Sequence, residues 1–245
     1  MNNKIKAAIL DLDGVITQTA SIHANAWKKL FDQYNQQRKE AGKSSYPEFS
    51  IDNDYKKYLD GKPRYEGVRS FLESQAIKIP YGKKDDDPQQ ETICGLGNRK
   101  NKFFQEALEE EGVSPFPDTV EKIKEWKAKG LKVAVISSSK NCKPVLKQAG
   151  IIDLFDAIVD GIESERRNIE GKPAPDIFLE AARELQVDSQ QAFIVEDAIA
   201  GVKAGEKGDF ALVVGMEKDE SQHDKLKQNG ADKVVASLKE LNITK

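Results

Sequence analysis

The sequence is poor in cysteine, in long apolar runs and in net charge, and each shortage excludes a class of protein. Its two cysteines, Cys94 and Cys142, lie far apart and fit no metal-ligand spacing, which indicates a reducing cytoplasm and no disulfide framework. No run approaches the ~20 apolar residues of a membrane span, and the N-terminal MNNKIKAAIL has no long apolar signal region. A net charge of -3 provides no general attraction for nucleic acid. We therefore expect a soluble, cytoplasmic and monomeric protein without a membrane or nucleic-acid partner.

The chain is long enough for one large core with a smaller domain, since it has 245 residues of which 38% are hydrophobic. From residue 117 onward, helical segments alternate with the short apolar strands LKVAVI, AIVD, AFIV and FALVVG. This alternation predicts an α/β fold with a doubly wound, Rossmann-like parallel sheet that is covered by helices on both faces. We expect a discontinuous α/β core formed by residues 1–16 and 113–245, and an inserted helical domain at 17–112.

Within the insertion, apolar periodicity predicts a helix from Thr19 to about Gln36, and another from Asn98 to Glu111. A further helix follows the loop DGKPR. The stretch from Lys39 to Asp60 is polar and irregular, and PYGKKDDDPQQE is predicted to be a solvated loop.

The segment AAILDLDGVI at residues 7–16 delivers two carboxylates to one strand end. Asp11 and Asp13 alternate along the strand, so their side chains point to the same side, and Gly14 permits a sharp turn directly afterwards. Two acids at the end of a buried strand repel each other and lose hydration, unless a cation or a reacting group compensates. The alternative is that these acids only cap a turn.

Other polar groups follow the remaining predicted strands. The carboxyl ends of neighbouring parallel strands converge on one crevice, so these groups should meet there: Asp11 and Asp13, Ser137, Lys172, and Glu196 with Asp197. Clustered acids suit Mg²⁺, while a hydroxyl and a lysine can hold phosphate oxygens. A carboxylate is the natural nucleophile, because the sequence has no Walker glycine loop. Alternatively, Ser137 is a helix cap and Lys172 a solvated loop residue.

The segments DLDGV, VISSSKN, GKPAPDIF and VEDAIAGV resemble, in order, the four motifs of haloacid dehalogenase-like phosphotransferases. The resemblance implies that Asp11 is the nucleophile and Asp13 the general acid and base. It implies that Ser137 and Lys172 hold the transferred phosphoryl group. It further implies a Mg²⁺ ion held by Asp11, by the backbone carbonyl of Asp13 and by Asp197, with Glu196 nearby or coordinating.

A closer likeness connects the chain with the β-phosphoglucomutase branch, through ITQTASIHANAW, DGKPR, NRKN, SSSKN and GKPAPDIF. In that branch a helical cap is inserted after the first motif. The likeness places His23 at the cap hinge, and Arg64 and Lys100 on the cap facing the cleft. Ser139, Lys140 and Asn141 would meet the distal phosphate from the core. The residues themselves leave open a packing role for His23, a surface position for Arg64 and a snorkelling position for Lys100.

Two departures from the branch affect the expected substrate. Gln18 stands where an acid is expected, and the polar loops around 44–53 and 78–97 lengthen the cap. The resemblance implies interconversion of β-D-glucose 1-phosphate and glucose 6-phosphate through an aspartyl-phosphate and a bisphosphate. The alternatives are a Mg²⁺-dependent phosphatase acting on a sugar phosphate, which the longer cap would allow to be larger, such as a trehalose-type phosphate, and a catalytically silent module that binds phosphometabolites.

Overall fold

The computed structural model describes residues 4–218 and 220–243. By its internal contacts the chain divides into two compact units. One, here called the core unit, comprises Met1–Gln18 and Val113–Lys245. The other, the helical unit, comprises Thr19–Gly112. The division falls two residues after the expected first boundary and at the expected second boundary.

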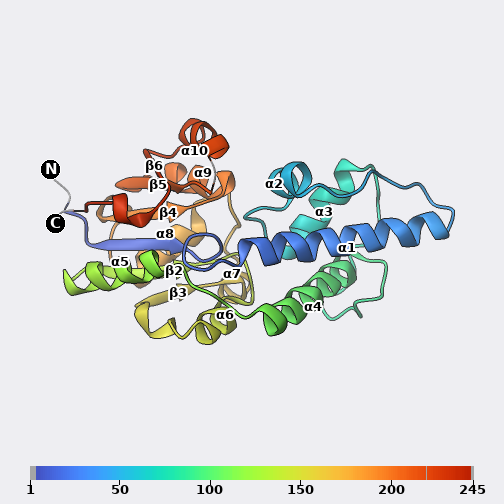
Figure 1. The fold of residues 1–245 in the computed structure, drawn as a ribbon, viewed down its shortest axis with the longest axis horizontal. Helices are drawn as coiled ribbons and strands as arrows, with labels where there is room; N and C mark the ends of the chain where they lie inside the picture. Colours follow the sequence, from blue (N-terminus) through green and yellow to red (C-terminus); the bar gives the residue numbers. More distant parts are fainter. Residues whose placement is uncertain (1–3, 219, 244–245) are drawn as a thin grey trace. The chain divides into compact units, whose positions relative to one another are not determined.

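The core unit is built on a parallel sheet of six strands in the order β3-β2-β1-β4-β5-β6 (Figure 1). The strands are β1 Ala7–Asp11, β2 Lys132–Ile136, β3 Ala157–Val159, β4 Ala192–Glu196, β5 Leu212–Met216 and β6 Lys233–Val235. This confirms the predicted doubly wound sheet, to which β6 adds a strand that the sequence patterns did not indicate. Asp11 pairs with Ile136, and Leu10 pairs with Val195. The strands β1, β2 and β4 therefore end at the same level, so the loops after them begin at one edge.

Helices cover both faces of the sheet, as expected for parallel strands that are buried on each side. Within β4, Ala192 and Ile194 belong to the same apolar cluster as Phe178 of α8. Phe193 lies between them in sequence and packs its ring against Trp126 of α5, with 5.0 Å between centroids. Since alternate strand residues point to opposite faces, α5 and α8 lie on opposite sides of the sheet. The core helices are α5 Pro117–Ala128, α6 Cys142–Gln148, α7 Gly161–Arg167, α8 Asp176–Glu184, α9 Ile199–Lys207 and α10 His223–Gln228.

The helical unit consists of α1 Ala20–Glu40, a π-helical turn Ile51–Tyr55, α2 Lys56–Tyr58, α3 Arg64–Ser74 and α4 Ile93–Glu111. Two helices are longer than the periodicity predicted: α1 continues past Gln36 to Glu40, and α4 begins before Asn98 at Ile93. The early start of α4 has a local cause. The Thr92 hydroxyl accepts a hydrogen bond from the Gly95 amide at 2.9 Å and caps the first turn.

The interior of the helical unit is an aromatic cluster around Phe31 and Phe71, whose ring centroids are 4.2 Å apart. The segment 39–60, expected to be polar and irregular, contributes to it. Tyr46 and Phe49 are both buried, and the Tyr46 hydroxyl donates a hydrogen bond to the Phe31 carbonyl at 2.8 Å. The sequence expectation was wrong for this part, because isolated aromatics in a polar stretch show no periodicity.

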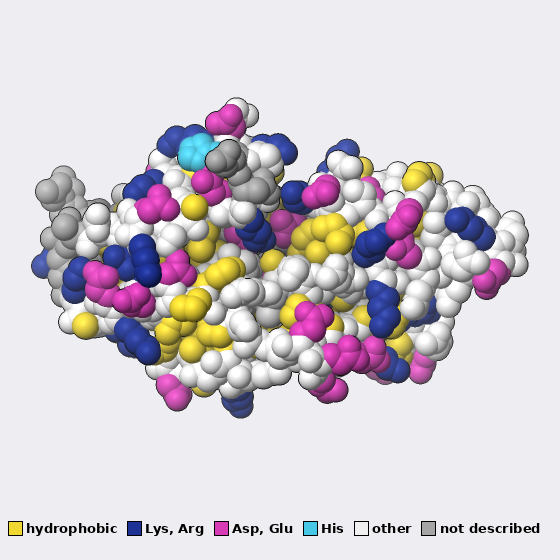
Figure 2. Space-filling model, in the orientation of Figure 1, with side chains coloured by type: hydrophobic (Ala, Val, Ile, Leu, Met, Phe, Trp, Pro, Cys, Tyr) yellow, Lys and Arg dark blue, Asp and Glu magenta, His cyan; other side chains and the backbone are white. Residues whose placement is uncertain are grey.

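The described helices include none that is long and apolar enough to cross a bilayer. Acidic and basic side chains are interspersed over the face drawn in Figure 2. Both cysteines are buried and free, and burial raises the pKa of the Cys142 thiol well above its usual value.

Candidate functional site

A buried lysine joins two strand ends of the core unit. Asp11, the last residue of β1, is only 6% exposed. The Lys172 ammonium donates a hydrogen bond to its Oδ1 atom at 2.6 Å and also pairs with the carboxylate of Glu196, the last residue of β4. Carboxylates that lose their hydration in this way are tolerated because a buried cation lies between them. Lys172 is thus not the solvated loop lysine of the alternative interpretation.

The pKa values of these three residues are shifted by burial and by one another's opposite charges. Burial raises the pKa of Asp11 well above its usual value, against the opposing effect of the Lys172 ammonium. Burial likewise raises the pKa of Glu196, and Lys172 again opposes the rise. Burial alone would lower the pKa of Lys172, but the carboxylates of Asp11 and Glu196 raise it above its usual value. Lys172 therefore remains a cation at neutral pH.

Three carboxylates converge beside Lys172. Asp11, Glu196 and Asp197 each offer an oxygen atom, and these oxygens all lie within 4.8 Å of one another. Space for them comes from glycine. A Cβ on Gly14, where φ is +85°, would lie 1.9 Å from Asp197 Oδ2, and one on Gly201 would lie 1.9 Å from Glu196 Cδ. This set of buried oxygen donors fits a hard divalent cation.

The sequence patterns did not indicate Lys218, which follows β5 and forms an ion pair with Asp197 Oδ2. Its side chain is 37% exposed, whereas that of Asp197 is almost fully buried. The position of Lys218 in the sequence could have predicted its place at the site. A cation just beyond the strand FALVVG falls at the same edge of the sheet as the other polar groups.

Asp13 and Ser137 lie next to this group. The Asp13 amide donates a hydrogen bond to Asp11 Oδ2 at 3.0 Å. The Ser137 hydroxyl stands 3.5 Å from Asp13 Oδ2, at the outer limit of a hydrogen bond, and accepts one from the Ser139 amide at 3.0 Å. The first acid of DLDG is therefore buried and fixed by Lys172, while the second is only partly buried.

The other residues of the SSSKN segment hold one another at the start of α6. The Ser139 hydroxyl accepts a hydrogen bond from the Asn141 amide at 3.1 Å. Lys140 forms an ion pair with Glu165 of α7. A role of these residues in binding a distal phosphate stays a prediction, and for Lys140 it requires that the ammonium leave Glu165.

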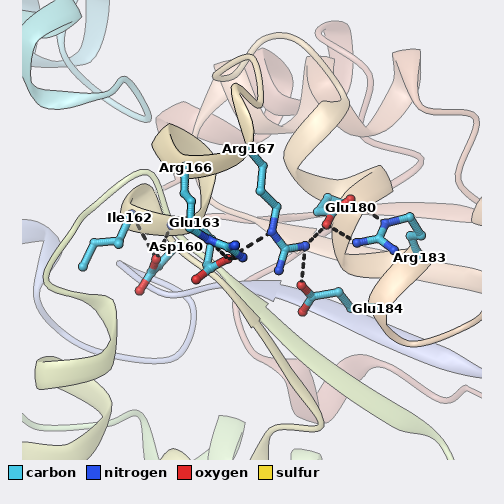
Figure 3. A network of polar contacts seen from close by, with 8 residues as sticks. All are labelled: Asp160, Ile162, Glu163, Arg166, Arg167, Glu180, Arg183 and Glu184. Carbon is cyan, nitrogen blue, oxygen red and sulfur yellow. Dashed lines mark hydrogen bonds and ion pairs between the residues drawn. The ribbon is translucent and has the colours of Figure 1, made fainter.

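Figure 3 shows a charged network between α7 and α8, the helices that precede and follow the loop carrying Lys172. Arg167, at the end of α7, reaches across to α8, where it contacts Glu180 and lies 2.8 Å from Glu184. Its Nε atom also donates to Glu163 of its own helix at 3.0 Å. Because α7 precedes the loop and α8 follows it, these ion pairs hold together the two ends of the loop that carries Lys172.

The helical unit brings together His23 and Lys100. The Lys100 ammonium donates to His23 Nδ1 at 2.5 Å, and the His23 ring stacks on Phe104 with 3.9 Å between centroids. Burial lowers the pKa of His23 well below its usual value, and the charges of Lys100 and Arg64 lower it further. His23 is accordingly neutral. The Arg64 guanidinium donates to Asn101 Oδ1 at 2.6 Å.

The chain is similar to known proteins along nearly its whole length. A profile of the haloacid dehalogenase-like hydrolase family matches residues 5–209. The β-phosphoglucomutase of Mycobacterium tuberculosis (strain CDC 1551) is 45% identical over 240 residues, which cover 97% of this chain and 92% of that protein. The β-phosphoglucomutase of Bacillus subtilis is 32% identical over 243 residues, covering 98% and 92%.

Among solved structures, the crystal structure of a β-phosphoglucomutase from Clostridium difficile aligns with a TM-score of 0.76 at 28% identity, and covers 97% of this chain and 93% of that one. The family profile and these relatives agree with the motif resemblance drawn from DLDGV, VISSSKN, GKPAPDIF and VEDAIAGV. The protein belongs to the haloacid dehalogenase-like hydrolase family.

Proposed function

We propose that this protein is a β-phosphoglucomutase, a phosphotransferase that interconverts β-D-glucose 1-phosphate and glucose 6-phosphate. Identity of 45% along 97% of the chain with a β-phosphoglucomutase supports the substrate. The observation that carries the chemistry is the buried Asp11 carboxylate, held by Lys172 beside Glu196 and Asp197. A carboxylate fixed among phosphate-holding groups is suited to accept and return a phosphoryl group.

In the proposed reaction the phosphoryl group moves between Asp11 and the sugar. An Asp11 carboxylate oxygen attacks phosphorus, the bond from phosphorus to the sugar oxygen breaks, and Asp13 gives that oxygen a proton. In the reverse sense, Asp13 takes the proton of a sugar hydroxyl, which attacks the phosphoryl group on Asp11. In the forward cycle Asp11 already carries a phosphoryl group taken from a bisphosphate, and its transfer to the free hydroxyl of a sugar monophosphate gives a new bisphosphate and frees the Asp11 carboxylate. Once the sugar has reversed, loss of its other phosphoryl group to Asp11 yields the isomer.

Other residues of the core unit assist by holding charge. Lys172 and the Ser137 hydroxyl are proposed to bind the oxygens of the transferred group. We propose that the metal is Mg²⁺, held by Asp11, by Asp197 and by the backbone carbonyl of Asp13, with Glu196 adjacent. When bound, such an ion neutralises charge on the phosphoryl oxygens.

We propose that residues 17–112 act as a cap that binds the far end of the substrate. Arg64 supports this role, because in the part of the chain that the structure describes its guanidinium bonds to amide oxygens of Asn98 and Asn101 and makes no ion pair. A planar guanidinium of this kind can grip a phosphate with two parallel hydrogen bonds. His23 and Lys100 would contribute from the same unit, and Ser139, Lys140 and Asn141 from the core unit.

The test separates a mutase from a phosphatase in one tube. β-D-Glucose 1-phosphate, with Mg²⁺ and a trace of β-glucose 1,6-bisphosphate, is followed by phosphorus NMR. A mutase converts it to glucose 6-phosphate with little free phosphate. Stoichiometric free phosphate without glucose 6-phosphate would refute the proposal and establish the phosphatase instead.

The Arg64→Ala variant sharpens this test. Loss of a charged hydrogen bond worth roughly 1.5–3 kcal/mol should slow isomerisation by about tenfold or more, and hydrolysis much less, because the transfer site is untouched. Arg69→Ala, on the same helix with its side chain 51% exposed, is the control and should react like wild type.

A further inference from the structure

The helical unit contains a polar cavity that shares no residue with the candidate site. Its volume is about 270 Å³, and its lining includes Tyr34, Gln37, Arg38, Lys43, Glu91 and Arg99. It lies toward the end of α1, whereas His23 lies near its beginning. Fourteen residues separate His23 from Gln37, which corresponds to about 20 Å along a helix. The cavity and the His23 cluster are thus distinct places on one unit.

Arg99 is the unusual residue of this cavity. It is 4% exposed, and its bonds go to neutral acceptors: the Pro88 carbonyl at 2.7 Å and Gln37 Oε1 at 3.0 Å. Among the described residues, it forms no ion pair. Burial lowers its pKa from the usual value, and the negative charge of Asp87 opposes this effect only in part, which reflects the cost of burying the guanidinium. An anion in the cavity would remove this cost.

A carboxylate already occupies the other end of the cavity. Glu91 accepts hydrogen bonds from the Tyr34 hydroxyl at 2.9 Å and from Lys43 at 2.6 Å, and lies 3.8 Å from Arg38. The Lys43 hydrogen bond lowers its pKa, so it is ionised. Its side chain is 42% exposed and can swing into solvent. Arg38, Lys43 and Arg99 together carry three positive charges against this one negative charge.

We propose that this cavity is a binding site for a small phosphate-bearing ligand, held by Arg38, Lys43 and Arg99 in place of the Glu91 carboxylate. The charge balance favours phosphate over a carboxylate ligand. A phosphate monoester carries about -1.5 to -2 at pH 7, so once the Glu91 carboxylate has moved away it neutralises the three cations more fully than a singly charged carboxylate ligand would. Two guanidinium groups and an ammonium are also the donors that proteins use most for phosphate oxygens.

The site is tested by titrating the ¹⁵N-labelled protein with inorganic phosphate, without added metal and at constant ionic strength set with chloride. We expect saturable shifts of the Ala41, Lys43 and Glu91 amide signals, separate from any at Asp13 and Ser137. Because the signals are assigned to residues, phosphate binding at the candidate catalytic site is recognised as such. Saturable shifts confined to Asp13 and Ser137, or none at all, would overturn the proposal.

Three variants should change the phosphate affinity of this cavity in different ways. Arg99→Gln should weaken phosphate binding at this cavity by about tenfold or more, the loss of one charged hydrogen bond. Glu91→Gln should tighten it severalfold, because it removes the negative charge that competes with phosphate for Arg38 and Lys43. Arg69→Gln, an exposed control on α3, should leave it unchanged. A purely structural network predicts no gain for Glu91→Gln, and the absence of that gain would contradict the proposal.

Discussion

Lys172 in the core unit and Lys100 in the helical unit are equally buried, each 4% exposed, yet their ammonium groups have different surroundings. Lys172 lies between the carboxylates of Asp11 and Glu196. Lys100 donates to neutral His23 and lies over the rings of Trp27 and Phe104, at 5.1 and 4.8 Å from their centroids. The core cluster is rich in acids, whereas the contacts described for Lys100 within the helical unit are with a neutral imidazole and two aromatic rings.

This difference suggests a division of labour. Three converging carboxylates favour a metal cation, and one of them is the proposed nucleophile, so we propose that the chemistry belongs to the core unit. The Arg64 guanidinium bonds to amide oxygens and retains its attraction for an anion, which agrees with the proposal that the helical unit holds substrate phosphate. Variants of the two units should consequently fail in different ways.

The largest effect should come from the core nucleophile. Asp11→Asn keeps the side-chain shape, but an amide does not accept a phosphoryl group, so turnover should fall by at least about 10⁴-fold. The rate of glucose 6-phosphate formation measures this, and circular dichroism controls for folding. Activity within a few fold of wild type would remove Asp11 from the chemistry.

The two lysines should differ in their contribution to stability. Lys172→Met leaves two buried carboxylates without their cation, which should lower the free energy of unfolding by about 3–5 kcal/mol in metal-free buffer. Lys100→Met, the matched variant, loses the hydrogen bond to neutral His23 and the cation-π contacts but also relieves a desolvated charge, so a smaller loss, of about 1 kcal/mol, is expected. Urea unfolding of both proteins provides the comparison. Equal losses would show that the surroundings of the lysines do not matter.

The neutral His23 of the helical unit should make the free energy of unfolding depend on pH. Below about pH 6.5 the unfolded chain protonates this histidine, while folded His23 has a lowered pKa and stays neutral. The contribution of His23 to the free energy of unfolding is therefore fully present above about pH 6.5. It declines as the pH falls further, by at most about 1.4 kcal/mol per pH unit. His23→Gln should remove this slope between pH 6.5 and 5, while His223→Gln, at an exposed position, should retain it. Identical slopes for His23→Gln and wild type would rule out a neutral His23.

The smallest effect should come from the network between α7 and α8. Arg167→Gln loses partly exposed ion pairs and should cost about 1 kcal/mol or less. It should also speed hydrogen exchange at Ala174, whose amide bonds to the Gly171 carbonyl in the Lys172 loop at 3.1 Å. Arg166→Gln, which loses only contacts with Glu163, is the control. Equal exchange at Ala174 in both variants would mean that the network does not support the loop.

The sequence predicted best what the topology of a parallel sheet requires. The strand pattern alone was enough to bring Asp11, Lys172, Glu196 and Asp197 together, because the carboxyl ends of neighbouring strands share one edge. Lys218 was not predicted, because the groups after the strand FALVVG were not considered. It nevertheless follows a parallel strand, as the other residues of the site do.

The helical unit was harder to predict, because its structure depends on packing. The start of α4 was placed too late, since glycines in ICGLGN suggest a loop, yet buried Ile93 and Leu96 and the Thr92 cap maintain the helix. The short α7 has no apolar face that the periodicity would reveal, as none of its residues is buried. Contacts such as that of Arg99 with Gln37 join residues distant in sequence and left no local pattern.

The most direct test of this account is to find where the phosphoryl group resides during turnover. The protein is mixed with β-glucose 1,6-bisphosphate and Mg²⁺, quenched in acid, digested and examined by mass spectrometry. The account predicts a phosphoryl group on Asp11, in the peptide that contains AAILDLDGVI, and none in the Asp11→Asn protein. A phosphoryl group on Asp13 or Ser137, or on any residue of the helical unit, would contradict it.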